Sequence, residues 1–354
     1  MSGDEPWVRE PLLVENLAAL FGFEALSRKL PREVYPPYLF AMTFLFVDLG
    51  LINTYLHLTG GTHILVDSPN IVAGPPAVLL AAFGIRYISE KYAEAVADIG
   101  IRERVGDDPT QFERIVPWRT KVAIYAVAVV VLYANIFANV GIEGAIRADG
   151  GTLELINWLF IFEFVYLPFV VEFGLIYYGV HFLLPRRVER ADIGLFFYDP
   201  LDMGGFAAVG QLLKRSYYLY TGGLLLFVVI VYGGVIFSFG GTPAGLFEAV
   251  FFSAAWIVGV ASIGHSMYTM HRIMSTEKNA RIRELRDEMR EVIENPYEIN
   301  ASTVTDEERL GDIRRRLEQV RGTRVYPATF TMWSQIAVSV LLPQALQLAL
   351  QAAG

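Results

Sequence analysis

The sequence predicts an all-α membrane protein, a polytopic bundle of seven transmembrane helices with a helical hairpin outside the membrane. Hydrophobic residues make up 54% of the 354-residue chain and the mean hydropathy is +0.40, which is too apolar for an ordinary soluble domain. Seven apolar segments have the length of a membrane-spanning helix. The basic residues fall almost entirely on one side of these segments.

The seven segments alternate with charged linkers. About 20 apolar residues in an α-helix cross the roughly 30 Å of bilayer hydrocarbon. The expected spans are approximately residues 38–58, 71–89, 122–140, 155–184, 218–239, 246–270 and 330–350.

The orientation of the chain follows from its Lys and Arg residues. The N-terminal segment and the linkers after the second, fourth and sixth spans hold nearly all of them, with twelve in the last linker. The outer loops contain only Arg147, so 28 of the 29 basic residues lie on one side, counting Arg86 at the inner end of the second span. The positive-inside rule therefore predicts a multi-pass plasma-membrane protein with its N-terminus inside and its C-terminus outside.

Three regions follow from this layout. Residues 1–36 form a cytoplasmic N-terminal segment that lacks the apolar core of a signal peptide, and residues 11–26 have the spacing of an interfacial helix. Residues 37–274 and 328–354 form the transmembrane bundle. Residues 275–327 form a cytoplasmic helical hairpin.

The hairpin is predicted from two apolar stripes with the spacing of a coiled-coil seam, joined by a turn at Asn295-Pro296. A helix over residues 246–294 would be roughly 73 Å long at 1.5 Å per residue and would extend well beyond the membrane. Thr305 and Glu308 have the spacing of a capping box for the second helix. The hairpin is interpreted either as a solvated, salt-bridged linker or as an oligomerisation or gating lever. Its predicted seam comprises Ile282, Leu285, Met289, Val292, Leu310, Ile313, Leu317 and Val320.

Composition excludes several kinds of chemistry. Cysteine is absent, so disulfides, thiolate metal sites and cysteine nucleophiles are excluded. The acidic, Lys-poor composition suggests a halophilic, archaeal source and argues against nucleic acid as a partner. His181, His265 and His271 do not share the spacing of a haem or metal site, and Ser262 with His265 is weak evidence for a nucleophile. We therefore expect no metal, no cofactor and no enzyme activity.

Two carboxylates are the main candidates for function. Asp48 in the first span and Glu163 in the fourth lie near mid-bilayer, and no basic residue falls at that depth. They must be protonated, hydrated or bound to a cation. Close together they would form a cation or proton site. Apart, each would be neutral and hydrogen-bonded to Asn53, Asn135 or a tyrosine.

Other polar and kinked positions are interpreted by depth. Glu172 lies near the inner boundary at the level of Arg86, which predicts a structural ion pair between them. Pro168 and Pro343 are expected to kink their helices and to free the carbonyls of Phe164 and Ser339. The last span is unusually polar for a membrane helix, with Gln335 and Ser339 among its polar residues. It is therefore expected to line a pathway.

These features favour an oligomeric cation channel whose pathway is lined by the last span, with membrane lipid as its surroundings. Two alternatives are a membrane sensor or scaffold whose hairpin binds a soluble partner, and a proton- or cation-coupled carrier of small solutes. In layout alone the arrangement of spans and hairpin is similar to insect chemoreceptor channels, with no shared motif.

Overall fold

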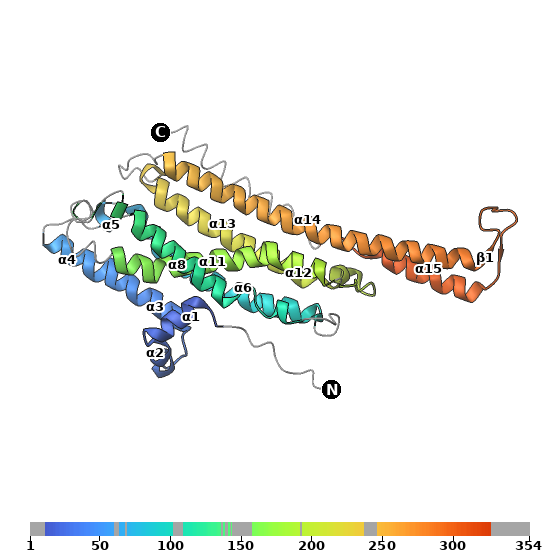
Figure 1. The fold of residues 1–354 in the computed structure, drawn as a ribbon, viewed down its shortest axis with the longest axis horizontal. Coiled ribbons are helices and arrows are strands. Elements are labelled where there is room, and N and C mark those ends of the chain that lie inside the picture. Colours follow the sequence, from blue (N-terminus) through green and yellow to red (C-terminus); the bar gives the residue numbers. More distant parts are fainter. Residues whose placement is uncertain are drawn as a thin grey trace.

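The computed structural model describes residues 11–326, with gaps at 60–63, 68, 102–108, 136, 139–140, 142, 144–157, 192 and 237–245. The described chain is mostly helical (Figure 1). Four of its helical segments are long and apolar enough to cross a membrane: Pro36–Leu58, Pro69–Asp98, Leu159–Arg190 and Ala207–Gly233. They correspond to the predicted first, second, fourth and fifth spans. The predicted third and sixth spans are not among them, and the seventh lies outside the described residues.

The first two spans are each built from more than one helical element. The first contains α3 (Pro36–Leu45), the π-helix η1 (Phe46–Ile52) and α4 (Asn53–Leu58). After the short α5 (Ile64–Asp67), the second contains the 3-10 helix η2 (Pro69–Ala73) and α6 (Gly74–Asp98). The next helices are the 3-10 helix η3 (Pro109–Phe112) and α8 (Trp118–Asn135).

The fourth predicted span is a continuous helical segment with two π-helical stretches. It runs through the π-helix η5 (Trp158–Tyr166), α11 (Leu167–Tyr178), the π-helix η6 (Gly179–Leu183) and α12 (Leu184–Arg190). The 3-10 helix η7 (Pro200–Gly205) then leads into α13 (Ala207–Ile236), which packs against α6, η2 and α14 (Leu246–Glu291). Close packing requires glycine at two crossings, since a Cβ on Gly84 would lie 2.7 Å from the Phe173 ring and one on Gly259 2.6 Å from the Tyr220 ring.

The N-terminal segment forms two short helices rather than the single interfacial helix expected over residues 11–26. They are α1 (Leu13–Leu20) and α2 (Phe23–Lys29), and the chain turns between them at Gly22, whose φ is +81°. A positive φ is readily adopted by glycine and ends α1. Phe21 and Phe23 then pack against the Phe40 and Phe44 rings of α3.

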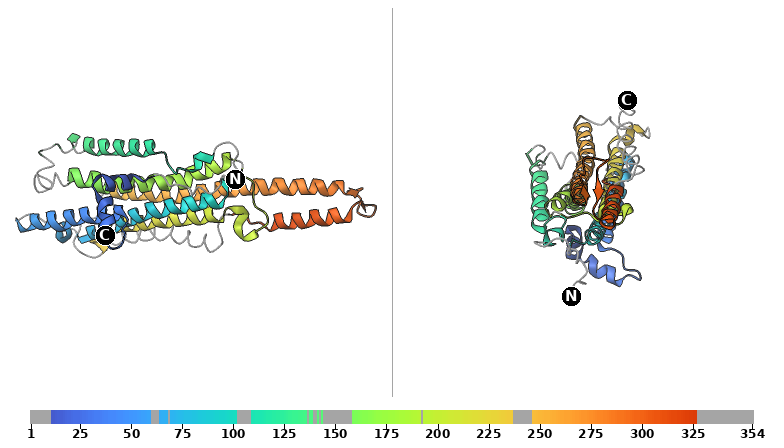
Figure 2. Two further views of the ribbon diagram at one scale, coloured as in Figure 1. Left: turned by 90° about the horizontal axis from the view of Figure 1, so that it is seen from below. Right: turned by 90° about the vertical axis from the view of Figure 1, so that its right-hand side faces the viewer.

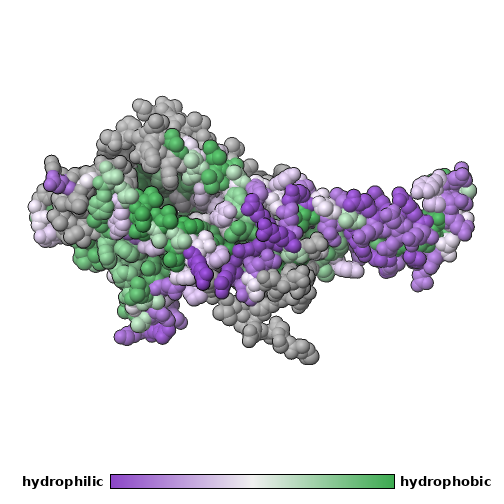
Figure 3. Space-filling model, viewed as in Figure 1, coloured by the Kyte–Doolittle hydropathy of each residue, from purple (hydrophilic) through white to green (hydrophobic). Residues whose placement is uncertain are grey.

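A long arm extends beyond the bundle (Figures 1 and 2). We define the α14–α15 arm as residues 275–326, which comprise the end of α14, the strands β1 (Ile293–Glu294) and β2 (Thr303–Val304), and α15 (Glu307–Gly322). The 46 residues of α14 correspond to about 69 Å at 1.5 Å per residue. The strands pair antiparallel, with Ile293 opposite Val304. Hydrophilic residues cover the arm, whereas hydrophobic residues cover much of the bundle face in the same view (Figure 3).

The interior of the arm holds the eight residues of the predicted seam in one hydrophobic cluster. Leu285 and Ile313 are completely buried, and Phe197 from the linker after α12 packs against the same cluster. The expected capping box is wrong, because the cap of α15 is Asp306, whose carboxylate accepts from the Arg309 amide at 2.9 Å. Thr305 instead donates from its amide and its hydroxyl to the Val292 carbonyl and so closes the end of the arm.

Candidate functional site

Glu163 is a buried acid in one of the four helical segments that are long and apolar enough to cross a membrane. It lies in η5, its side chain is 0% exposed, and neither carboxylate oxygen has a hydrogen-bond partner among the described residues. An ionised carboxylate in such a site is costly unless it is paired. Among the described residues, no ion pair or hydrogen bond compensates the burial of the Glu163 carboxylate.

Pro168 sets the backbone next to Glu163. It lies in the first turn of α11, where the chain changes from π-helix to α-helix. The sequence predicted a freed carbonyl on Phe164, four residues earlier. The structure shows that the carbonyl of Glu163, five residues before Pro168, accepts from the Tyr125 hydroxyl of α8 at 2.8 Å. The Tyr133 hydroxyl donates in the same way to the Leu159 carbonyl.

Asp48 lies in a different π-helix, η1, and its side chain is bound by η5. The Tyr166 hydroxyl donates to Asp48 Oδ2 at 2.6 Å. Asn53 Nδ2 donates to the Asp48 carbonyl at 3.0 Å and to Oδ1 at 3.4 Å. Asp48 thus has the asparagine and tyrosine partners expected if the two acids lie apart, whereas Glu163 has none among the described residues.

The predicted ion pair between Arg86 and Glu172 is wrong. Arg86 Nε pairs with Glu90 at 2.8 Å, and its guanidinium lies 4.8 Å from the centre of the Tyr35 ring. Glu172 is completely buried and pairs with Lys121 Nζ at 3.0 Å. Sequence position suggested Arg86 as the partner, whereas the packing of α8 on α11 brings Lys121 to Glu172.

Glu172 also holds the N-terminal segment onto the bundle. Its two carboxylate oxygens accept from the amides of Leu13 and Val14 at 2.8 and 2.9 Å. These amides begin α1 and have no partner inside that helix, so a carboxylate satisfies both of them.

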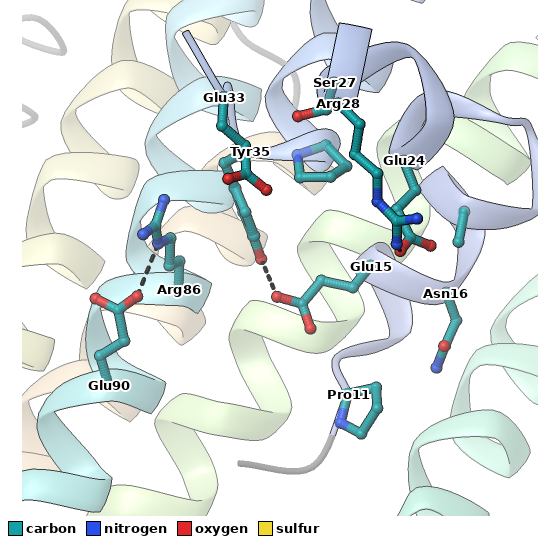
Figure 4. Close-up of a pocket in the computed structure, with 12 residues that line it drawn as sticks. Pro11, Glu15, Asn16, Glu24, Ser27, Arg28, Glu33, Tyr35, Arg86 and Glu90 are labelled. Atoms are coloured by element: carbon teal, nitrogen blue, oxygen red, sulfur yellow. Dashed lines mark hydrogen bonds and ion pairs between the residues drawn. The ribbon is translucent and has the colours of Figure 1, made fainter. Parts of the chain in front are cut away.

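A pocket of about 640 Å³ lies between α1, α2, the start of α3 and α6 (Figure 4). The Tyr35 hydroxyl donates to Glu15 Oε1 at 2.9 Å across it. Arg28 pairs with Glu24 along α2, and Arg86 pairs with Glu90 along α6. Both arginines already have carboxylate partners, so neither is an unpaired cation for a ligand. We therefore interpret the pocket as a polar junction between the N-terminal segment and the bundle.

A second buried polar cluster joins three helices. His181 in η6 is completely buried, with Nδ1 3.1 Å from the hydroxyl of Ser266 on α14 and Nε2 3.0 Å from that of Ser216 on α13. One turn away the Tyr177 hydroxyl lies 2.6 Å from that of Ser262. The sequence analysis did not predict this cluster. Its one signal is spacing, because Tyr177 and His181 are four residues apart on one helix, as are Ser262 and Ser266 on α14, so each pair shares a helix face.

Several predicted positions cannot be compared with the structure. Gln335, Ser339 and Pro343 lie outside the described residues, as does the side chain of Asn135. His265 does not pair with Ser262, because its ring stacks on Phe182 at 5.0 Å. Within the described ranges, no three His, Asp or Glu side chains converge as a metal site.

The chain was compared with known proteins at three levels. Protein-family models, curated proteins and solved structures gave no match to it.

Proposed function

We propose that this chain is a membrane transport protein that passes protons or small cations through an oligomeric channel. The observation that carries the proposal is the Glu163 carboxylate, which is fully buried in a membrane-spanning segment with no hydrogen-bond partner among the described residues. A structural acid is normally paired, as Glu172 is with Lys121. An acid that needs a proton or cation to be neutral is a site at which that ion binds.

The local backbone supports this role. Three π-helices of the described chain, η1, η5 and η6, contain the buried residues Asp48, Glu163 and His181, respectively. A π-helical turn interrupts the regular backbone ladder and is frequent at functional sites. The coincidence of these three π-helices with a buried ionisable side chain favours function over simple packing.

The pathway combines this site with predictions from the sequence. Glu163 binds the ion, and Asp48, held by Tyr166 and Asn53, keeps a negative charge or a proton on the neighbouring span. The last span, with Gln335 and Ser339, lines the remainder. The protein crosses the plasma membrane seven times, with its N-terminus and the α14–α15 arm in the cytoplasm.

The arm has the connections needed to couple its own movement to the pathway. A single helix, α14, joins the bundle to the arm. The end of α15 and the residue that follows it are hydrogen-bonded to α14. Lys278 Nζ on α14 donates to the carbonyls of Arg321 and Thr323 at 2.8 and 2.7 Å. Nearby, His271 Nδ1 bonds to the Val325 carbonyl at 2.9 Å, and its ring stacks on Tyr326.

The test is ion flux from the purified protein in liposomes under proton and alkali-cation gradients. Glu163→Gln keeps the shape of the side chain but cannot bind a cation or exchange a proton, so we expect flux to fall by about tenfold or more. Glu90→Gln, at an exposed glutamate paired with Arg86, is the matched control and should conduct like wild type. Equal flux from wild type and Glu163→Gln, or no flux from wild type under either gradient, would reject the proposal.

A further inference from the structure

The far end of the α14–α15 arm exposes apolar side chains that the arm itself does not use. We define the arm tip as residues 293–308. Tyr297 and Ile299 are 84% and 90% exposed, the highest values among the large hydrophobic residues of the described chain. Single exposed apolar residues are common, but two together at the end of a hydrophilic arm are typical of a contact surface.

The backbone holds these side chains outward. The β1–β2 pair closes the tip, and the Glu298 amide donates to the Asn295 carbonyl at 3.0 Å. The Ala301 amide then donates to the Glu298 carbonyl at 2.9 Å. Tyr297 and Ile299 therefore lie on two hydrogen-bonded turns and not on an open loop.

The seam of the arm is not available to a partner. Leu285, Leu310 and Ile313 are at most 4% exposed because the two helices bury them against each other. The sensor alternative, in which these residues capture a protein, would require the helices to separate. The tip needs no rearrangement.

Charge indicates what the tip binds. It carries five acidic residues and no Lys, Arg or His. Asp306 caps α15, and the other four, Glu294, Glu298, Glu307 and Glu308, form no ion pair among the described residues. On the shaft of the arm, by contrast, acids pair with arginines, as Glu284 does with Arg281 and Asp287 with Arg290.

We infer that the arm tip is a docking site for a soluble protein that presents an apolar pocket rimmed by Lys and Arg. Complementary charge attracts such a partner, and Tyr297 and Ile299 fill its pocket. An anionic membrane surface would repel the five acidic residues. Copies of this chain in one membrane share an orientation, so their tips could meet only other tips of like charge. This inference does not depend on ion transport.

The first test measures binding of short helical peptides to the full chain in phosphatidylcholine nanodiscs, with empty nanodiscs subtracted. A Lys–Leu peptide presents the expected chemistry, a Lys–Ser peptide only its charge, and a Glu–Leu peptide only its apolar face. We expect the Lys–Leu peptide to bind best, and Tyr297→Ser with Ile299→Ser to weaken it about tenfold or more. Glu298→Gln with Glu307→Gln should weaken binding and flatten its dependence on salt.

The control alters shaft acids instead. Glu284→Gln with Asp287→Asn removes two charges that have arginine partners and should leave peptide binding unchanged. The inference is wrong if the Tyr297 and Ile299 variant binds the Lys–Leu peptide as wild type does, or if the Glu–Leu peptide binds equally well.

The second test identifies the occupant in intact cells by a photo-crosslinking amino acid at position 299. An adduct with a soluble protein through a Lys- or Arg-rich segment supports the inference if that partner, once purified, binds the wild-type chain but not the Tyr297 and Ile299 variant. An adduct with a second copy of the chain or with lipid, or no adduct at this position, overturns it.

Discussion

Lys121 and Glu172 form a buried ion pair between α8 and α11, with 3.0 Å between Nζ and Oε1 and side chains 4% and 0% exposed. The same carboxylate accepts from the first amides of α1. One acidic side chain therefore joins two helices of the bundle and the N-terminal segment. Each group is satisfied only while all three elements are in place.

Breaking this pair should destabilise the bundle strongly. Lys121→Met leaves the Glu172 charge buried without its cation, and we expect a loss of about 3–5 kcal/mol in the free energy of unfolding. The measurement is denaturant unfolding in detergent micelles. The exposed pair Lys91 and Glu94 is the control, and Lys91→Met should cost no more than about 1 kcal/mol. A cost for Lys121→Met no larger than that of the control would contradict the assignment.

The protection of α1 against protease and hydrogen exchange provides a second test of the role of Glu172. In Glu172→Met the amides of Leu13 and Val14 lose their acceptors, so α1 should become sensitive to protease and to hydrogen exchange. The double variant Lys121→Met with Glu172→Met restores charge balance and should recover part of the bundle stability. It should not recover protection of α1.

Loss of either serine that contacts His181 should destabilise the bundle. Ser266→Ala or Ser216→Ala leaves one ring nitrogen of a fully buried histidine without a partner, at an expected cost of about 1–3 kcal/mol in unfolding free energy. Thr276→Ala, on the exposed face of α14, is the control and should change stability by less than about 0.5 kcal/mol. Equal stability of all three variants would show that the His181 contacts carry no net stabilisation.

The base of the arm should become more stable at alkaline pH. Burial lowers the pKa of the Lys278 amine from its ordinary value of 10.5, so the unfolded arm binds this proton more tightly than the folded arm. Stability therefore rises with pH from the lowered pKa up to the ordinary one, and is lowest where the amine is charged in both states. The measurement is the denaturant midpoint of the arm, followed by a fluorescent label on α15, from pH 8 to 10.5.

Lys278→Met tests the origin of that rise. The variant has no amine to titrate, so its midpoint should be flatter over the same pH range. It should also be less stable at pH 8, because the carbonyls of Arg321 and Thr323 lose their donor. A rise with pH as steep as that of wild type would assign the titration to another group.

Much of the local structure could be predicted from spacing alone. The apolar stripes of the arm define which faces of α14 and α15 meet, because a helix repeats every 3.6 residues whatever surrounds it. Apolar length identified the four spans found among the described residues. The helix boundaries were less predictable: Gly22 divides the N-terminal segment, and Asp306 rather than Thr305 caps α15.

The π-helices and the partners of buried groups could not be predicted. A π-helical turn changes the direction of every later side chain without changing composition, so the face on which a residue after η5 lies does not follow from α-helical spacing. Depth in the membrane placed Arg86 level with Glu172. It could not show that Lys121 faces this acid and that Glu90 binds Arg86.

By itself the sequence determined the four apolar segments found among the described residues and the seam of the arm, because hydrophobicity and helical periodicity are local properties of the chain. Only the tertiary structure decided that Asp48 binds Tyr166, that Glu172 holds α1, that His181 joins three helices and that Glu163 has no partner among the described residues. Those relationships depend on how helices rotate and cross, and that is decided by packing between residues far apart in the sequence.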